Sequence, residues 1–129
     1  MTSGAIILYV DDEPVNLMLF EQLFRKRHTV LTANSGFAGL EKLKENPEVD
    51  VIISDMKMPG MNGIEFIRQA KIFFPKKLFY ILTGYEITPE IQHALENGLI
   101  SKYFQKPFNM VEIDHAIGEE LGTGSKQSL

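Results

Sequence analysis

Five polar residues stand where apolar runs of this sequence end, and their side chains could together transfer a phosphoryl group. They are Asp11 and Asp12 after the first run, Asp55 after the third, Thr83 after the fourth and Lys106 after the fifth. Carboxylates that converge on one place repel one another, and a hard divalent cation such as Mg²⁺ removes that cost. Lys106 would add positive charge for a phosphate oxygen, and Thr83 would add a hydrogen-bond donor. The chemistry indicated is phosphoryl transfer onto an Asp carboxylate.

The residues around Asp55 place it at the open end of a buried strand. The preceding Val-Ile-Ile of 51–53 is typical of an interior strand. The Pro-Gly pair at 59–60 and the Asn-Gly pair at 62–63 cannot continue a strand. The chain must therefore leave the sheet just after Asp55, with the carboxylate in the turn.

The whole sequence alternates short apolar runs with helical patterns. We expect strands at 5–10, 29–33, 49–54, 78–82 and 103–104. The helices between them should begin near Pro14, Gly36, Ile64 and Pro89, with a last one from Met110, and the first should carry the basic triplet 25–27 in its final turn. No tight hairpin joins successive strands, so the pattern predicts a parallel sheet covered on both faces, a doubly wound α/β domain. In such folds the functional crevice lies beyond the carboxyl ends of the strands.

Composition limits the classes of protein. A chain of 129 residues with 44% hydrophobic residues fits one domain, which we place at 1–121, followed by a flexible tail at 122–129. The net charge of -4 and the scattered basic residues disfavour direct binding to nucleic acid. The absence of cysteine excludes disulfides, thiolate nucleophiles and Cys-ligated metals.

The ends of the chain and its histidines carry little sign of other functions. Residues 1–4 lack a basic signal-peptide region, and the apolar run that follows ends at Asp11, too soon for a membrane span. We therefore expect a cytoplasmic protein without membrane contact. His28, His93 and His115 are far apart, and surface or helix-face positions suit them better than metal binding.

Several motifs together resemble the receiver domains of two-component response regulators. They are Asp-Asp-Glu at 11–13, Asp55 followed by Met-Pro-Gly-Met-Asn-Gly at 58–63, Thr-Gly at 83–84, and Tyr-Phe-Gln-Lys-Pro-Phe at 103–108. The resemblance covers nearly the whole chain. It implies a flavodoxin-like (βα)5 fold whose sheet has the strand order 2-1-3-4-5.

The resemblance also implies a phosphoacceptor and its metal site. Asp55 would take a phosphoryl group from the phosphohistidine of a sensor histidine kinase or phosphotransfer protein. Asp12, Asp55 and the backbone carbonyl of Lys57 would hold Mg²⁺, and Asp11 would contribute mostly through water. Such a protein is a signalling domain that catalyses its own phosphorylation and dephosphorylation and turns over no diffusible substrate.

A switch to an output surface is implied in the same way. Lys106 would pair with the phosphoryl group, while Thr83 and Tyr103 would form the switch pair. Their movement would reshape the face made by the fourth helix, the fifth strand and the fifth helix. A downstream effector or a second receiver would then bind there.

The chain departs from the family pattern at two positions and shows no output domain. Gly84 replaces the alanine commonly found after the switch Thr, and Lys57 places a cation where the side chain lies near the phosphoryl group. Gly84 should loosen the following loop and alter how the backbone meets the phosphate, and Lys57 bears on the lifetime of the phosphoryl group. No second core or DNA-binding helix pair follows residue 117, which leaves open a stand-alone receiver and a segment of a hybrid kinase or longer regulator.

Two other classes share parts of this pattern. Phosphohydrolases of the haloacid dehalogenase type also place an Asp nucleophile and Mg²⁺ at strand ends, but they resemble Asp-x-Asp-x-Thr where this chain has Asp-Asp-Glu-Pro-Val at 11–15. A flavin- or nucleotide-binding module would need a Gly-rich phosphate loop after the first strand, where Pro14 stands. Multiple turnover of a phosphate ester would indicate the first class, and cofactor absorbance the second.

Overall fold

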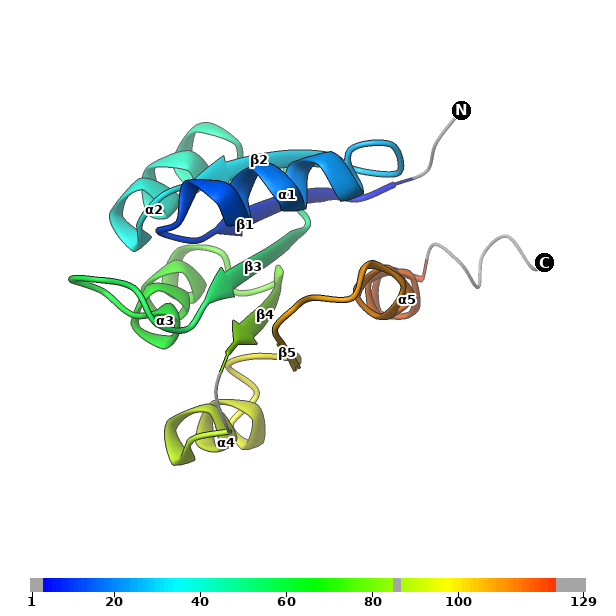
Figure 1. Ribbon diagram of the computed structural model, residues 1–129. Coiled ribbons are helices and arrows are strands. Elements are labelled where there is room, and N and C mark those ends of the chain that lie inside the picture. Colours follow the sequence, from blue (N-terminus) through cyan, green and yellow to red (C-terminus); the bar gives the residue numbers. More distant parts are fainter. Residues whose placement is uncertain (1–3, 85–86, 123–129) are drawn as a thin grey trace.

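The computed structural model describes residues 4–84 and 87–122 and has a parallel sheet at its centre (Figure 1). The strands are β1 (Ile6–Val10), β2 (Thr29–Ala33), β3 (Val51–Asp55), β4 (Leu78–Thr83) and β5 (Lys102–Gln105), in the order β2-β1-β3-β4-β5. The helices are α1 (Pro14–Phe24), α2 (Gly36–Glu45), α3 (Gly63–Phe73), α4 (Pro89–Glu96) and α5 (Met110–Leu121). The expected doubly wound α/β fold and its strand order are confirmed.

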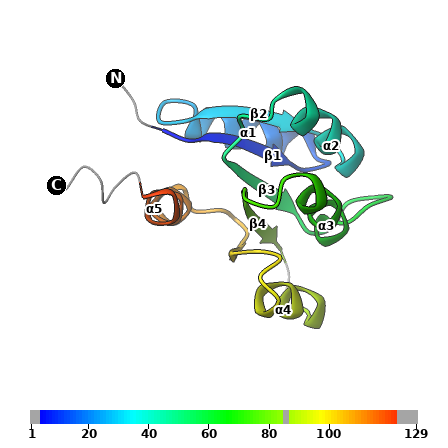
Figure 2. The same ribbon diagram turned by 180° about the vertical axis from the view of Figure 1, so that it is seen from behind.

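Helices cover both faces of the sheet. Figures 1 and 2 show α1 and α5 on one side and α2, α3 and α4 on the other. Successive strand residues point to opposite faces, so Ile7 and Tyr9 pack toward α1 and α5, while Leu8 and Val10 pack into the other core. Burial on both faces explains why the strands are continuous apolar runs rather than alternating ones.

The first turns of the helices follow local sequence signals. Pro14 occupies the first turn of α1, where no amide hydrogen is needed. Asn62 accepts a hydrogen bond from the Glu65 amide, and the Glu65 carboxylate accepts one from the Asn62 amide, which closes a capping box. This box fixes the start of α3 at the end of the turn that follows Asp55.

Some element boundaries differ from those expected. The third strand begins at Val51 rather than residue 49 and includes Asp55, and β5 extends over Lys102–Gln105. The basic triplet 25–27 lies beyond the last turn of α1, because the helix ends at Phe24, whose carbonyl accepts amide hydrogen bonds from Arg27 and His28 in the turn that follows.

His28 differs from the expectation most clearly. Its side chain is 6% exposed and lies in the connection between α1 and β2, neither on the surface nor on a helix. Nδ1 accepts a hydrogen bond from the Ala5 amide, and Nε2 lies 2.7 Å from Oδ1 of Asp114 on α5. His28 therefore ties the start of β1 to α5 as a structural residue.

The carboxyl-terminal end of the described chain is helical up to Leu121. Gly122 ends α5 with a left-handed φ of 74°. The rest of the expected tail, residues 123–129, lies outside the described residues. Within ranges 4–84 and 87–122, no helix has the length and apolar character needed to cross a membrane.

Candidate functional site

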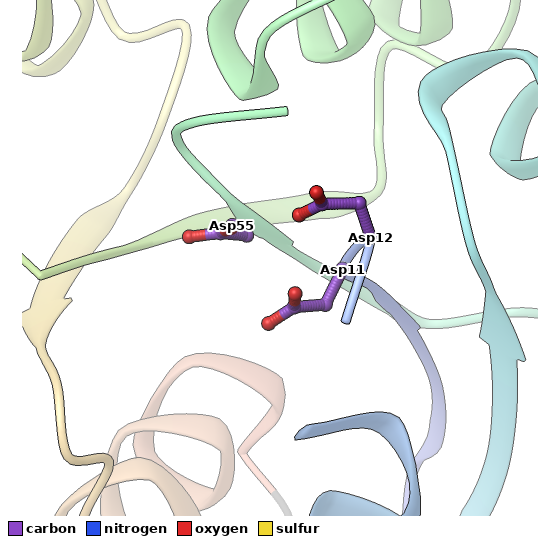
Figure 3. Close-up of side chains that lie close together, drawn as sticks. All are labelled: Asp11, Asp12 and Asp55. Carbon is purple, nitrogen blue, oxygen red and sulfur yellow. The ribbon is translucent and has the colours of Figure 1, made fainter. Parts of the chain in front are cut away.

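Three carboxylates meet at the carboxyl end of the sheet. The strands β1 and β3 are neighbours, with Val10 opposite Ser54, so the residues that follow them lie side by side. One carboxylate oxygen each from Asp11, Asp12 and Asp55 lies within 4.8 Å of the others. Figure 3 shows the three side chains projecting into a shared space. This set of oxygen ligands fits a hard divalent cation.

The Asp11 carboxylate is held by hydrogen bonds from within the protein. It is fully buried. Its Oδ2 accepts from the Tyr9 hydroxyl at 2.6 Å, from Asn16 Nδ2 at 3.2 Å and from Lys106 Nζ at 3.3 Å. Its Oδ1 accepts from the Glu13 amide at 3.0 Å. A carboxylate offers about four lone-pair positions, so these donors leave Asp11 little capacity for direct metal ligation.

Lys106 joins two of the acids. Its backbone amide donates to the Thr83 carbonyl at 2.8 Å, which sets the end of β5 against the end of β4. Its ammonium lies 3.1 Å from Asp55 Oδ1 and 3.3 Å from Asp11 Oδ2. Burial alone would lower the pKa of Lys106, but the hydrogen bond and charge of Asp55, with those of Asp11, raise it above its usual value. Lys106 is therefore a fixed positive charge.

Asp55 is under opposing electrostatic influences. Burial raises its pKa, the hydrogen bond from Lys106 lowers it, and the charges of Asp11 and Asp12 raise it again. The net pKa lies above the ordinary value of an Asp side chain. A bound cation would favour the ionised carboxylate, which is the form that can act as a nucleophile.

A cleft opens onto this cluster. It has a volume of about 850 Å³, and its lining includes Asp12, Asp55, Lys57, Thr83 and Lys106. Thr83 is 2% exposed, whereas Lys57 is exposed. The residues singled out in the sequence as candidates for phosphoryl chemistry thus share one site, with Asp11 buried beneath it.

Tyr103 lies apart from that cleft. It is half-buried on β5 and lines a separate hollow of about 390 Å³ together with residues of α4 and α5 that include Leu95, Glu112 and His115. The structure therefore places the expected switch pair at two different surfaces, with Thr83 in the cleft and Tyr103 beside the last two helices.

Tyr9 and Asn16, which no sequence pattern singled out, shape the site, and Gly63 has a role there beyond ending the strand. Tyr9 stands two residues before Asp11 along a strand direction, a spacing that puts side chains on one face. Asn16 lies in the first turn of α1, directly after the acidic turn. Gly63 lets the backbones approach closely, because a Cβ there would lie 2.4 Å from the Asp55 carbonyl oxygen. The first two could have been found from their spacing; the third depends on tertiary contact.

Comparison with known proteins fits this geometry. The family model of the response regulator receiver domain matches residues 7–118. This chain belongs to that family. The receiver is 34% identical to Sporulation initiation phosphotransferase F of Bacillus subtilis, over 89% of this chain and 92% of that protein. It is 31% identical to Transcriptional regulatory protein ZraR of Klebsiella oxytoca, over 89% of this chain but 26% of that protein.

Solved structures agree with the family assignment. A response regulator receiver domain protein from Clostridium thermocellum superposes with a TM-score of 0.82 at 31% identity, over 95% of this chain and 98% of that one. The receiver belongs to two-component phosphorelay signalling. None of these matches supports the haloacid dehalogenase alternative.

Proposed function

We propose that Asp55 is the phosphoacceptor and takes its phosphoryl group from the phosphohistidine of a sensor histidine kinase or phosphotransfer protein. The observation that carries this proposal is the position of Lys106, whose ammonium lies 3.1 Å from Asp55 Oδ1 at the edge of a cluster of carboxylates. An Asp oxygen attacks the phosphorus, the phosphorus–nitrogen bond of the donor breaks, and a phosphorus–oxygen bond to Asp55 forms.

The surrounding residues would neutralise the charge of the transferred group. Bound Mg²⁺ would supply positive charge to the phosphoryl oxygens, held by Asp12, Asp55 and the Lys57 backbone carbonyl. Asp11 would act mostly through water, in keeping with its many protein donors. Lys106 pairs with a phosphoryl oxygen, and Thr83 donates a hydrogen bond to another.

The domain acts as a signalling protein in this proposal. It catalyses its own phosphorylation and later dephosphorylation, in which water takes the phosphoryl group from Asp55, and it turns over no diffusible substrate. The exposed Lys57 side chain and Gly84 line the cleft, so both can influence how water reaches the phosphoryl group.

An apolar surface beside the cleft suits the phosphodonor protein. Leu19 and Leu23 of α1 are 45% and 47% exposed, and with Phe108 they line a groove of about 490 Å³ that also includes Lys106. A phosphohistidine must approach Asp55 within bonding distance, so its protein must cover the rim of the cleft where this groove begins. Burial of these side chains would favour association.

The phosphoryl state would be read at the face formed by α4, β5 and α5, where an effector or a second receiver binds. Tyr103 lies in this face, next to a hollow between α4 and α5. Direct binding to nucleic acid and contact with a membrane are not part of the proposal, and the place of action would be the cytoplasm.

Intact mass spectrometry after treatment with acetyl phosphate tests the proposal. A single phosphate adduct should form with Mg²⁺ and be absent with excess chelator. Asp55→Asn should abolish it, while Asp50→Asn, which alters a carboxylate at the opposite end of β3, should leave it. An adduct that survives Asp55→Asn, or that forms equally well in chelator, would overturn the assignment.

A further inference from the structure

A buried tyrosine hydroxyl supports the acidic cluster from below. Tyr9 is fully buried, and its hydroxyl donates to Oδ2 of Asp11 at 2.6 Å. That distance is typical of a charge-assisted hydrogen bond from a hydroxyl to a carboxylate. Burial, and then the hydrogen bond to Asp11, raise the pKa of Tyr9 far above its usual range. The proton therefore stays on the tyrosine, which acts as a donor.

The ring of Tyr9 is fixed by aromatic packing. It stacks on Phe20 of α1 with centroids 4.2 Å apart and planes at 10°, and Phe20 stacks on Phe24 in the same way at 4.1 Å and 9°. Phe108 meets the Tyr9 ring edge-on at 6.3 Å. A ring confined in this way holds its hydroxyl in one place.

The other side chains that donate to Asp11 divide their hydrogen bonds. Lys106 lies between Asp11 at 3.3 Å and Asp55 at 3.1 Å. Asn16 Nδ2 lies 3.2 Å from Asp11 Oδ2 and 3.2 Å from Glu13 Oε1. If Lys106 pairs with a phosphoryl group on Asp55, its bond to Asp11 weakens. The hydroxyl of Tyr9 has no competing acceptor among the hydrogen bonds of the described residues.

We propose that Tyr9 is a positioning residue, which holds Asp11 in the orientation that the metal site requires and keeps it there when Lys106 turns to the phosphoryl group. This inference rests on the proposed function, because it concerns the same site. It predicts that loss of the hydroxyl alone weakens Mg²⁺ binding without loss of the fold.

The sheet offers a matched control. Tyr80 stands on β4 at the same level as Tyr9, since both are register partners of Ile53, and both side chains pack in the core beneath α1 and α5. Tyr80 is also fully buried, and its hydroxyl donates to a carboxylate, that of Glu120, at 2.9 Å. Glu120 lies on α5 outside the acidic cluster. Tyr9→Phe and Tyr80→Phe thus remove the same atom from two fully buried rings of one core, the first beside the acidic cluster and the second away from it.

The test is Mg²⁺ titration of the full chain without any phosphoryl donor, followed by backbone amide NMR. Tyr9→Phe should weaken Mg²⁺ affinity roughly tenfold, the range found when an outer partner of a metal ligand is removed. The Glu13 amide donates to Asp11 Oδ1, so its metal-free signal should shift in Tyr9→Phe and not in Tyr80→Phe. Tyr80→Phe should bind Mg²⁺ as the parent does, and thermal unfolding should show both variants folded.

The outcomes separate this inference from the function on which it rests. Parent-like Mg²⁺ affinity in Tyr9→Phe, or an equal loss in Tyr80→Phe, overturns the role of Tyr9 and leaves Asp55 phosphorylation intact. Absence of Mg²⁺ binding by the parent protein overturns both. If Tyr9→Phe fails to fold, the hydroxyl is needed for the fold itself, and the positioning role falls in favour of a purely structural one.

Discussion

The ammonium of Lys106 lies 3.1 Å from Oδ1 of Asp55, whose side chain is only 9% exposed. This single cation does not offset the burial of Asp55 and the charges of two neighbouring carboxylates, and the pKa of Asp55 stays above its usual value. The ionised form of the Asp55 carboxylate is therefore disfavoured in the metal-free site. Binding of a divalent cation would relieve that cost, which makes the site responsive to metal.

The raised pKa of Asp55 predicts how stability depends on pH. A group whose pKa is higher in the folded than in the unfolded state contributes stability at low pH, which is lost as the pH rises through the folded value. Asp55→Asn removes this loss, so its unfolding free energy relative to the parent should increase from about pH 4 to pH 7. Urea unfolding of both proteins without metal, at a series of pH values, measures this difference in unfolding free energy. A difference that stays constant or shrinks over this range would contradict the electrostatic account.

The two adjacent acids should respond differently to removal. Asp12 is half-buried, and no hydrogen bond or ion pair to its side chain occurs within 4–84 and 87–122, whereas Asp11 is fully buried and accepts from several donors. Asp12→Ala should weaken Mg²⁺ binding while metal-free stability holds or rises, because carboxylate repulsion falls. Asp11→Ala should lower the unfolding free energy by about 1–3 kcal/mol, since buried donors lose their acceptor. Calorimetry with and without Mg²⁺ compares them, and a clear metal-free loss in Asp12→Ala would assign that residue a structural role.

The turn after Asp55 depends on a close backbone approach at Gly63. An alanine Cβ there would lie 2.4 Å from the Asp55 carbonyl oxygen and 2.8 Å from Ile81 Cδ1. Gly63→Ala should therefore cost about 1–3 kcal/mol of stability and slow the phosphorylation of Asp55.

Gly84 provides a control position for the Gly63→Ala substitution. A Cβ at Gly84 would meet Lys106 Cδ at 3.9 Å, an ordinary contact. Gly84→Ala should keep the fold and gain about 0.4–1 kcal/mol through a less flexible unfolded chain. Thermal unfolding of the two variants distinguishes them, and equal effects would show that the contact at Gly63 does not constrain the turn.

The convergence of the site residues could be predicted because it needs little more than the positions of the strand ends. In a parallel sheet all carboxyl ends lie at one edge, so Asp55, Thr83 and Lys106 must be near one another once their strands are adjacent. The strand order itself came from family resemblance, since hydrophobic periodicity does not say which strands are neighbours.

The details of the site depended on tertiary contacts that no local pattern records. The His28 side chain is only 6% exposed because the turn after α1 directs it against Asp114 on α5, a residue far along the chain. The hydrogen bond from Tyr9 to Asp11 was not predicted, although strand spacing could have suggested it. Its importance depends on the packing of Phe20 and on how Lys106 divides its bonds. The roles of these side chains therefore became apparent only with the fold.

Thr83 and Tyr103 lie on the same face of the sheet, which makes the expected switch geometrically possible. The register pairs Ile81 with Tyr103 and Thr83 with Gln105, and Ile81 and Tyr103 both pack in the core beneath α3 and α4. Residues two apart on a strand share a face, so Thr83 stands diagonally across from Tyr103. Movement of Thr83 toward a phosphoryl oxygen in the cleft would leave space on the side where the Tyr103 ring lies.

We expect phosphorylation of Asp55 to shift the packing of Tyr103 through Thr83. A coupling of about 1–3 kcal/mol between the two sites is sufficient to change the population of two arrangements. Changes in backbone amide NMR signals on addition of beryllofluoride, a phosphoryl mimic, should extend from Asp55 to Thr83, Tyr103 and α4.

Thr83→Ala should keep the shifts around Asp55 and remove those at Tyr103, because the methyl group left behind cannot follow the phosphoryl oxygens. Thr88→Ala, which removes the hydroxyl that caps α4, serves as the control, since it alters the start of α4 and leaves Thr83 and Tyr103 in place, so the shift at Tyr103 should persist. Shifts confined to the surroundings of Asp55, or distant shifts that persist in Thr83→Ala, would show that the output face is reached by another path even if Asp55 is phosphorylated.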